Sequence, residues 1–98
     1  MYSILNTDEF NDWLSSLRDA KGKARILARL RSAELGNLGD SEPVGEGVSE
    51  MRIHYGPGYR VYYKKIGNVL IILLLGGDKS SQKRDIKKAK ALASELKE

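Results

Sequence analysis

The chain has 98 residues, enough for one small domain with a modest core, and we expect a single domain over residues 1–98. It contains no cysteine, which excludes disulfides and thiolate metal sites. Its longest apolar run, residues 69–75, is too short to span a membrane.

The net charge of +4 is unevenly distributed along the chain. Residues 1–50 carry 6 Lys/Arg and 9 Asp/Glu, a net charge of −3, whereas residues 51–98 carry 11 Lys/Arg and 4 Asp/Glu, a net charge of +7. A basic half suggests an anionic partner such as nucleic acid, although lysines that only aid solubility would give the same charge. The start, MYSILNTDEF, lacks the features of a signal peptide, so we expect a cytoplasmic protein.

The first half of the chain predicts a short strand and two helices. The apolar segment 2–5 favours a strand, and a helix is expected over residues 8–17, with Thr7 as its N-cap. The segment KGKARILARLRSAELG has the pattern of an amphipathic helix that ends near Gly36. Residues 37–47 are rich in Gly, Asp, Ser and Pro, and we interpret them as a loop.

From residue 48 the hydrophobic period changes from that of a helix to two, which predicts a β-hairpin around the turn 56–58. If Tyr55 pairs with Tyr59, the register is fixed. Arg60 then lies opposite His54, and Tyr62 lies opposite Arg52. Side chains opposed on one face of a hairpin lie about 5 Å apart. This register predicts that one open face gathers Glu50, Arg52, His54, Arg60 and Tyr62.

The strand 69–75 is apolar on both faces and therefore belongs at the centre of the sheet, covered on both sides. Gly76 and Gly77 are expected to turn the chain sharply away from it, and Ser80 or Ser81 to cap a final, lysine-rich helix. The predicted fold is α+β with the order β-α-α-β-β-β-α, a mainly antiparallel sheet with helices packed on it.

The expected open face has the composition of a site for phosphodiester chemistry. His54 is the single histidine and can exchange protons near neutral pH, although a lone histidine is more often structural or merely exposed. Arg52 and Arg60 would bind phosphate and, by repulsion, favour the neutral imidazole that a general base needs. Tyr62 could stack on an unpaired base or be an ordinary cross-strand aromatic. Glu50 could be an acid/base group or, more simply, a salt-bridge partner of Arg52.

Other chemistries lack the residues they need. There is no P-loop motif, and no His, Asp or Glu set has metal-ligand spacing. The serines at 80 and 81 have no obvious general base. We therefore expect no cofactor and no metal. The remaining chemistry is metal-free attack of an RNA 2′-hydroxyl on its own phosphodiester, an endoribonuclease reaction to which DNA would be inert.

The stretch VSEMRIHYGPGYRVYYKKIGNVLIILLLGGDKSSQKRDIKKAKAL closely resembles the C-terminal half of RelE/ParE-superfamily toxins, in particular the HigB-like addiction-module killer proteins. Two motifs carry the resemblance: E-x-R-I-x-Y-G-P-G-Y-R-V-Y-Y and L-L-x-G-G-D-K-S-S-Q-x-x-D-I. The resemblance implies the toxin of a type II toxin-antitoxin system. Such a toxin is an mRNA interferase that cleaves mRNA on the ribosome without a metal and arrests translation.

The resemblance also implies site residues and partners. Arg52, Arg60 and Lys79 match basic positions that act on the scissile phosphate, and we add His54 to this catalytic set. The final segment has Asp85 near the place where such enzymes often have a base-stacking tyrosine. Either Tyr62 substitutes for it, or the acid/base set differs and involves His54. We assign RNA binding to Glu50, Tyr62, Lys83 and Arg84.

The implied partners are the ribosome, mRNA and a helix-turn-helix antitoxin from the same operon, with operator DNA contacted only through the antitoxin and no membrane. The alternatives are a ParE-like inhibitor of DNA gyrase and an inactive homologue that still binds an antitoxin.

Overall fold

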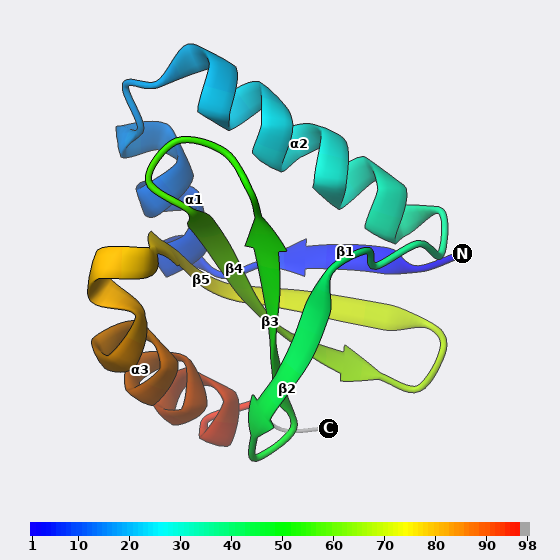
Figure 1. The fold of residues 1–98 in the computed structure, drawn as a ribbon. Helices are drawn as coiled ribbons and strands as arrows, with labels where there is room; N and C mark the ends of the chain where they lie inside the picture. Colours follow the sequence, from blue (N-terminus) through cyan, green and yellow to red (C-terminus); the bar gives the residue numbers. More distant parts are fainter. Residues whose placement is uncertain (97–98) are drawn as a thin grey trace.

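The computed structural model describes residues 1–96 and is an α+β fold built on one five-stranded sheet (Figure 1). The strand order is β1-β5-β4-β3-β2, with β1 parallel to β5 and all other neighbours antiparallel. The elements are β1 (Ser3–Asn6), α1 (Asp8–Ser16), α2 (Ala20–Glu34), β2 (Ser41–Gly45), β3 (Val48–Ile53), β4 (Tyr59–Ile66), β5 (Leu70–Asp78), a 3-10 turn η1 (Lys79–Ser81) and α3 (Gln82–Ser94).

The predicted α+β class is confirmed at this level, together with both N-terminal helices. Thr7 caps α1 as expected, because its hydroxyl accepts a hydrogen bond of 3.0 Å from the backbone N–H of Phe10. Asp19 caps α2 in the same way through the backbone N–H of Gly22. Among residues 1–96, no helix is long and apolar enough to cross a membrane.

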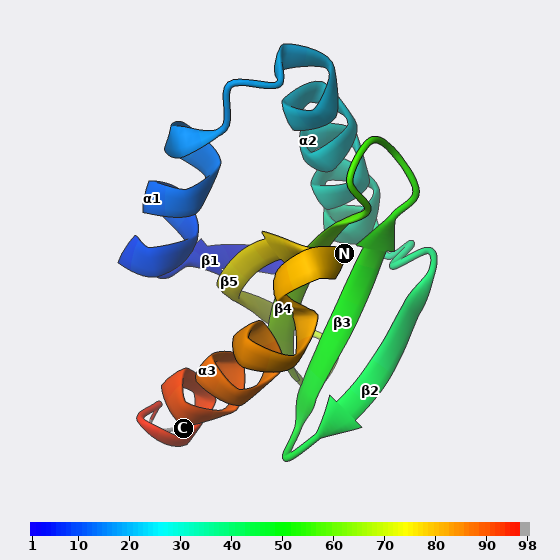
Figure 2. The same cartoon turned by 60° about the vertical axis from the view of Figure 1, so that its left-hand side comes forward.

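Helices cover both faces of the sheet, so the core has two layers (Figure 2). The helices α1 and α2 bury the larger layer, which contains Phe10, Ile26, Met51 and Val61. The helix α3 covers the opposite face over a second layer that includes Tyr62. The strand β5 is apolar on both sides because it lies between β1 and β4 and is covered on both faces, as predicted. The predicted central position was wrong, because β4 is the central strand.

The prediction of a continuous loop over 37–47 was wrong, because Ser41–Gly45 form the edge strand β2. Ser41 pairs with Met51 and Pro43 with Ser49 in an antiparallel ladder with β3. The sequence signal for this strand is weak because Val44 is its only large apolar residue, and proline usually argues against a strand. An edge strand tolerates proline, because its outer N–H groups need no partner in the sheet.

The expected turn at Gly76 and Gly77 was also wrong, because both glycines lie within β5 and β5 continues to Asp78. The reason for glycine here is close packing. A Cβ on Gly76 would lie 2.0 Å from the Trp13 ring, and a Cβ on Gly77 would lie 2.0 Å from the Asp85 carboxylate. Glycine therefore lets α1 and α3 approach the same strand from opposite faces.

The hairpin of β3 and β4 has a register that differs from the predicted one by two residues. Ile53 pairs with Tyr59, so the connection contains five residues, 54–58, instead of three. As a result Arg60 lies opposite Arg52, and Tyr62 lies opposite Glu50. Because side chains alternate with a period of two, this shift keeps every strand residue on its predicted face. It moves His54 out of the sheet.

Candidate functional site

The face of the hairpin that was expected to be open is covered by α3, and a buried carboxylate lies at its centre. Glu50 is 1% exposed and contacts three side chains. Its carboxylate accepts hydrogen bonds from Arg52 Nε at 3.1 Å and Gln82 Nε2 at 2.9 Å, and it lies 3.5 Å from Arg60 Nε. We call Glu50, Arg52, Arg60 and Gln82 the Glu50 cluster. Glu50 is the anchor of this cluster, so its interpretation as a salt-bridge partner of Arg52 is confirmed, and its burial gives no support to its assignment to RNA binding.

Arg52 is surrounded by acidic side chains instead of facing a phosphate-sized hollow. Besides Glu50, its guanidinium lies 3.5 Å from Glu42 and 4.0 Å from Asp40. The hydrogen bond to Glu50 and the neighbouring carboxylates raise the pKa of Arg52. Its charge is therefore neutralised within the protein, and we do not retain Arg52 as a direct phosphate ligand.

Arg60 is held more rigidly and reaches the surface at one end. Its side chain is 12% exposed, and Nη1 donates a hydrogen bond of 2.7 Å to the Gly58 carbonyl. A Cβ placed on Gly58 would lie 3.2 Å from Arg60 Nη1 and 3.5 Å from Lys79 Cβ. Glycine at this position therefore allows both cationic side chains to lie against the loop 54–58.

Tyr62 is fully buried beneath α3, which agrees with its interpretation as an ordinary cross-strand aromatic and not with a ring exposed for stacking on a nucleobase. Its hydroxyl is buried near Glu50 and has no hydrogen-bond partner among the described residues. Burial, followed by the negative charge of Glu50, raises the pKa of Tyr62 well above the usual value of tyrosine. Tyr62 is a core residue.

His54 follows the last residue of β3, and its side chain is 74% exposed. It does not lie opposite Arg60 as expected, and the group in contact with it is an acid. The imidazole Nε2 lies 2.5 Å from Oδ2 of Asp40, a residue in the segment before β2. The hydrogen bond from His54 lowers the pKa of Asp40. The sequence reasoning did not find Asp40, because fourteen positions separate the two residues and the segment was read as a plain loop.

A hollow of about 390 Å³ brings three of the predicted catalytic residues together. The loop 54–58 forms one wall, and Arg60 and Lys79 form the other. Its lining residues are His54, Tyr55, Gly56, Pro57, Gly58, Arg60 and Lys79. We call this the loop hollow. Its volume suits a ligand the size of a nucleotide.

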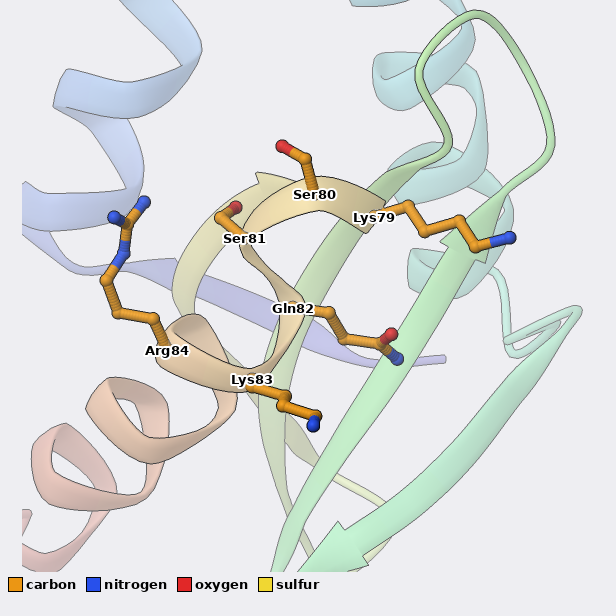
Figure 3. A pocket seen from close by; sticks show the side chains of 6 residues that line it. All are labelled: Lys79, Ser80, Ser81, Gln82, Lys83 and Arg84. Atoms are coloured by element: carbon orange, nitrogen blue, oxygen red, sulfur yellow. The ribbon is translucent and has the colours of Figure 1, made fainter.

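A second hollow lies next to it, at the junction of β5 and α3 (Figure 3). It is lined by residues 79–84, and Lys79 belongs to both hollows. In Figure 3 the side chains of Lys79, Gln82 and Lys83 extend toward β3, whereas Arg84 points the other way. Lys83 is therefore placed to extend the cationic surface from Lys79, and Arg84, 4.0 Å from Asp85, lies on a different side of the helix.

The junction itself is held by a local network of hydrogen bonds. The Asp78 carboxylate caps η1 by accepting from the backbone N–H of Ser80 at 2.9 Å. Ser81, the N-cap of α3 by position, makes no capping bond with its side chain and donates instead to the buried carboxylate of Asp85. These contacts fix the direction in which Lys79 leaves the sheet.

Two arginines of α2 also support the site. Arg29 donates hydrogen bonds to the backbone carbonyls of Arg52, Leu38 and Asp40, so it fastens α2 to the segment before β2. The Arg25 guanidinium lies 4.8 Å from the centroid of the Tyr55 ring, beside the loop hollow. Within residues 1–96, no group of three or more His, Cys, Asp or Glu side chains is arranged to hold a metal ion.

Comparison with known proteins shows the family of this chain but no function. No family model matches the chain. A protein of Haemophilus influenzae (strain Rd), described only as an uncharacterized protein, is 52% identical over 93 residues, which cover 95% of this chain and 94% of the relative. The chain belongs to the same family as this Haemophilus protein. Identity of this extent over nearly the full length of both chains indicates that the two share one fold.

Proposed function

We propose that this protein is the toxin of a type II toxin-antitoxin system and acts as a ribosome-dependent mRNA endonuclease. The resemblance of its C-terminal half to RelE/ParE toxins of the HigB-like branch supports this proposal, and the α+β sheet is compatible with it. The observation that carries it is the loop hollow, where a histidine, an arginine and a lysine converge at the surface.

Each of these three side chains has a part in phosphodiester cleavage. The guanidinium of Arg60, held by the Gly58 carbonyl and Glu50, is a preorganised donor for a phosphate oxygen. The ammonium of Lys79 adds a second positive charge beside it. His54 accepts the proton of the ribose 2′-hydroxyl, which then attacks the adjacent phosphorus. The expected product carries a 2′,3′-cyclic phosphate.

The cationic surface also suggests how such a toxin would be neutralised. Lys79 and Lys83 are exposed around the two hollows, and Arg60 lies between the loop and Lys79. An acidic segment of an antitoxin laid over this surface would occupy the phosphate position. A complex in which this surface stays open would contradict direct occlusion.

The test is induced expression in a bacterial host, followed by mapping of mRNA 5′ ends. The wild type should stop growth and produce new ends inside translated codons. Lys79→Ala should reduce cleavage by about tenfold or more, because it removes a charge that faces the transition state. The exposed Lys88 on α3, outside both hollows, gives the matched control, and Lys88→Ala should cleave like the wild type.

Arg60→Ala should abolish cleavage, but it also removes a partner of buried Glu50. Circular dichroism must therefore show that this variant is folded, and the exposed Lys79 gives the result that is independent of folding. Growth arrest with intact mRNA and cleaved DNA–gyrase complexes would replace the nuclease with a gyrase inhibitor. Intact mRNA without growth arrest would leave only a protein that binds an antitoxin.

A further inference from the structure

We propose that Asp40 is the positioning residue of His54, holding the imidazole with its proton on Nε2 so that Nδ1 is the proton acceptor in the loop hollow. This inference rests on the proposed nuclease function for the role of the proton transfer. The orientation of the ring is a separate matter that can be measured without any activity.

Asp40 and His54 are in direct side-chain contact. The carboxylate oxygen Oδ2 lies 2.5 Å from Nε2, within hydrogen-bond distance. An ionised carboxylate can only accept, so Nε2 must donate. In a neutral imidazole one nitrogen carries the proton and the other accepts, and a proton fixed on Nε2 leaves Nδ1 free to act as a base.

The backbone of Asp40 is anchored on two sides, which makes this more than a chance surface pair. The backbone N–H of Arg52 donates a bond of 2.9 Å to the Asp40 carbonyl. Arg29 reaches from α2 to the carbonyls of Leu38, Asp40 and Arg52. The segment before β2 is therefore tied to both α2 and β3, and its carboxylate is held at the start of the loop 54–58.

Several charged groups act on this pair, and their signs favour an ionised Asp40. Arg52 lies 4.0 Å from the Asp40 carboxylate, and Arg29 contacts the Asp40 backbone. Together with the bond from His54, these charges lower the pKa of Asp40, which keeps the carboxylate an acceptor at neutral pH. The other charged and titratable side chains that line the loop hollow are Tyr55, Arg60 and Lys79. Arg25 and Arg29 line a separate hollow on the α2 side of His54.

His54 is the only base that this reaction step needs. Nδ1 of His54 takes the proton of the 2′-hydroxyl, the 2′-oxygen forms a bond to phosphorus, and the bond from phosphorus to the 5′-oxygen breaks. The departing 5′-oxygen takes a proton from water. The imidazolium formed at His54 is stabilised by the Asp40 carboxylate and returns its proton to hydroxide.

The first experiment determines the tautomer of His54 by nitrogen–proton correlation NMR of the whole protein. With a single histidine in the sequence, the imidazole signals need no further assignment. The wild type should show the Nε2–H tautomer. Asp40→Asn replaces a carboxylate that can only accept with an amide that can also donate to Nε2, so this variant should populate the Nδ1–H tautomer more than the wild type does.

Glu42→Gln is the matched control. Glu42 is a carboxylate near Arg52, two residues after Asp40 and within β2, and among residues 1–96 it makes no ion pair or hydrogen bond with His54. This variant should keep the wild-type imidazole spectrum. The second experiment measures mRNA cleavage on ribosomes, where Asp40→Asn and His54→Ala should each be slower by about a hundredfold and Glu42→Gln should match the wild type.

Two results would overturn the inference. An imidazole spectrum of Asp40→Asn identical to that of the wild type would show that Asp40 does not fix the tautomer. A changed spectrum with undiminished cleavage by Asp40→Asn and His54→Ala would show that the pair takes no part in proton transfer. Failure of the proposed function is recognised differently, because the wild type itself would then leave mRNA intact.

Discussion

The Glu50 cluster and the loop hollow both contain charged side chains and share Arg60, yet they differ in how far those charges are buried. In the cluster, Glu50 is 1% exposed and the Arg60 side chain 12%, and the charges satisfy one another. In the hollow, His54 is 74% exposed and Lys79 also faces solvent, so their groups are available to a ligand. Arg60 belongs to both regions, since its guanidinium contacts Glu50 and also lines the loop hollow. Composition alone does not separate a structural charge from a functional one.

The largest effect should come from removing the buried acid of the Glu50 cluster, measured against the exposed Glu42, which lies outside the loop hollow. Glu50→Ala leaves Arg60 partly buried without its carboxylate, so we expect the free energy of unfolding to fall by about 3–5 kcal/mol. Glu42→Ala removes an exposed partner of Arg52 and should cost less than about 1 kcal/mol. Urea unfolding of both variants checks this. Equal losses would mean that burial does not distinguish the two carboxylates.

The junction of β5 and α3 carries both Lys79 of the loop hollow and Gln82 of the Glu50 cluster, and its packing can be tested at Gly77. An alanine Cβ there would lie 2.0 Å from Asp85 and 3.1 Å from the Ser81 hydroxyl, so Gly77→Ala should destabilise the fold by about 1–3 kcal/mol and displace the junction that carries Lys79. Asp85→Ala in the same chain opens the space, and the double variant should recover part of the loss. A double-mutant cycle measured by thermal unfolding gives the coupling. Additive effects would contradict the proposed clash.

A buried titratable group also lies on the other face of the sheet, where Tyr59 belongs to the core layer under α1 and α2. Burial, together with the hydrogen bond that Tyr59 donates to Asp19 at 2.8 Å, raises the pKa of Tyr59 to about 12 from 10.0. The folded state keeps this proton longer than the unfolded state, so the contribution to stability is complete below pH 10 and is lost as the pH rises through about 12.

Denaturant unfolding at a series of alkaline pH values tests this sign. The wild type should lose stability over that window, and Tyr59→Phe should show a flatter dependence because it has no phenol to ionise. Tyr2→Phe serves as the control for the loss of one tyrosine. A slope for Tyr59→Phe as steep as that of the wild type would show that other groups govern alkaline unfolding.

The smallest effect is expected at Tyr62, which is buried beneath α3 beside the Glu50 cluster. Its hydroxyl is buried without a hydrogen-bond partner among the described residues, so Tyr62→Phe should change stability by less than about 1 kcal/mol, in either direction. Cleavage of mRNA should be unchanged, because the ring lies under α3. A large loss of cleavage in a fully folded Tyr62→Phe protein would restore the role in RNA binding that the structure argues against.

Local patterns allowed much of the fold to be predicted. Helical spacing and the caps at Thr7 and Gly36 predicted α1 and α2, and alternation predicted β3 and β4. The two-residue error in register did not change the faces, because the period of a strand is two. The strand β2 was missed because its polar, proline-containing sequence becomes a strand only when β3 pairs with it.

The site was predicted only in part, for a different reason. His54, Arg60 and Lys79 converge because β3 and β5 both pair antiparallel with β4. The strands β3 and β5 therefore end where β4 begins. Glu50, Arg52 and Tyr62 do not lie on an open face as predicted, because sequence alternation gives the face of a side chain but not what covers that face. The cover is α3, and Gln82 at its first turn completes the Glu50 cluster.

The sequence by itself determined the secondary structure of most segments, the α+β class and the concentration of positive charge in the second half, since these depend on neighbours within a few residues. Only the tertiary structure decided which charges are buried, where Asp40 meets His54, and why two glycines interrupt an apolar strand. Each of these depends on contacts between segments distant in the chain, such as α3 against β3 or α2 against the residues before β2. No local pattern encodes such contacts.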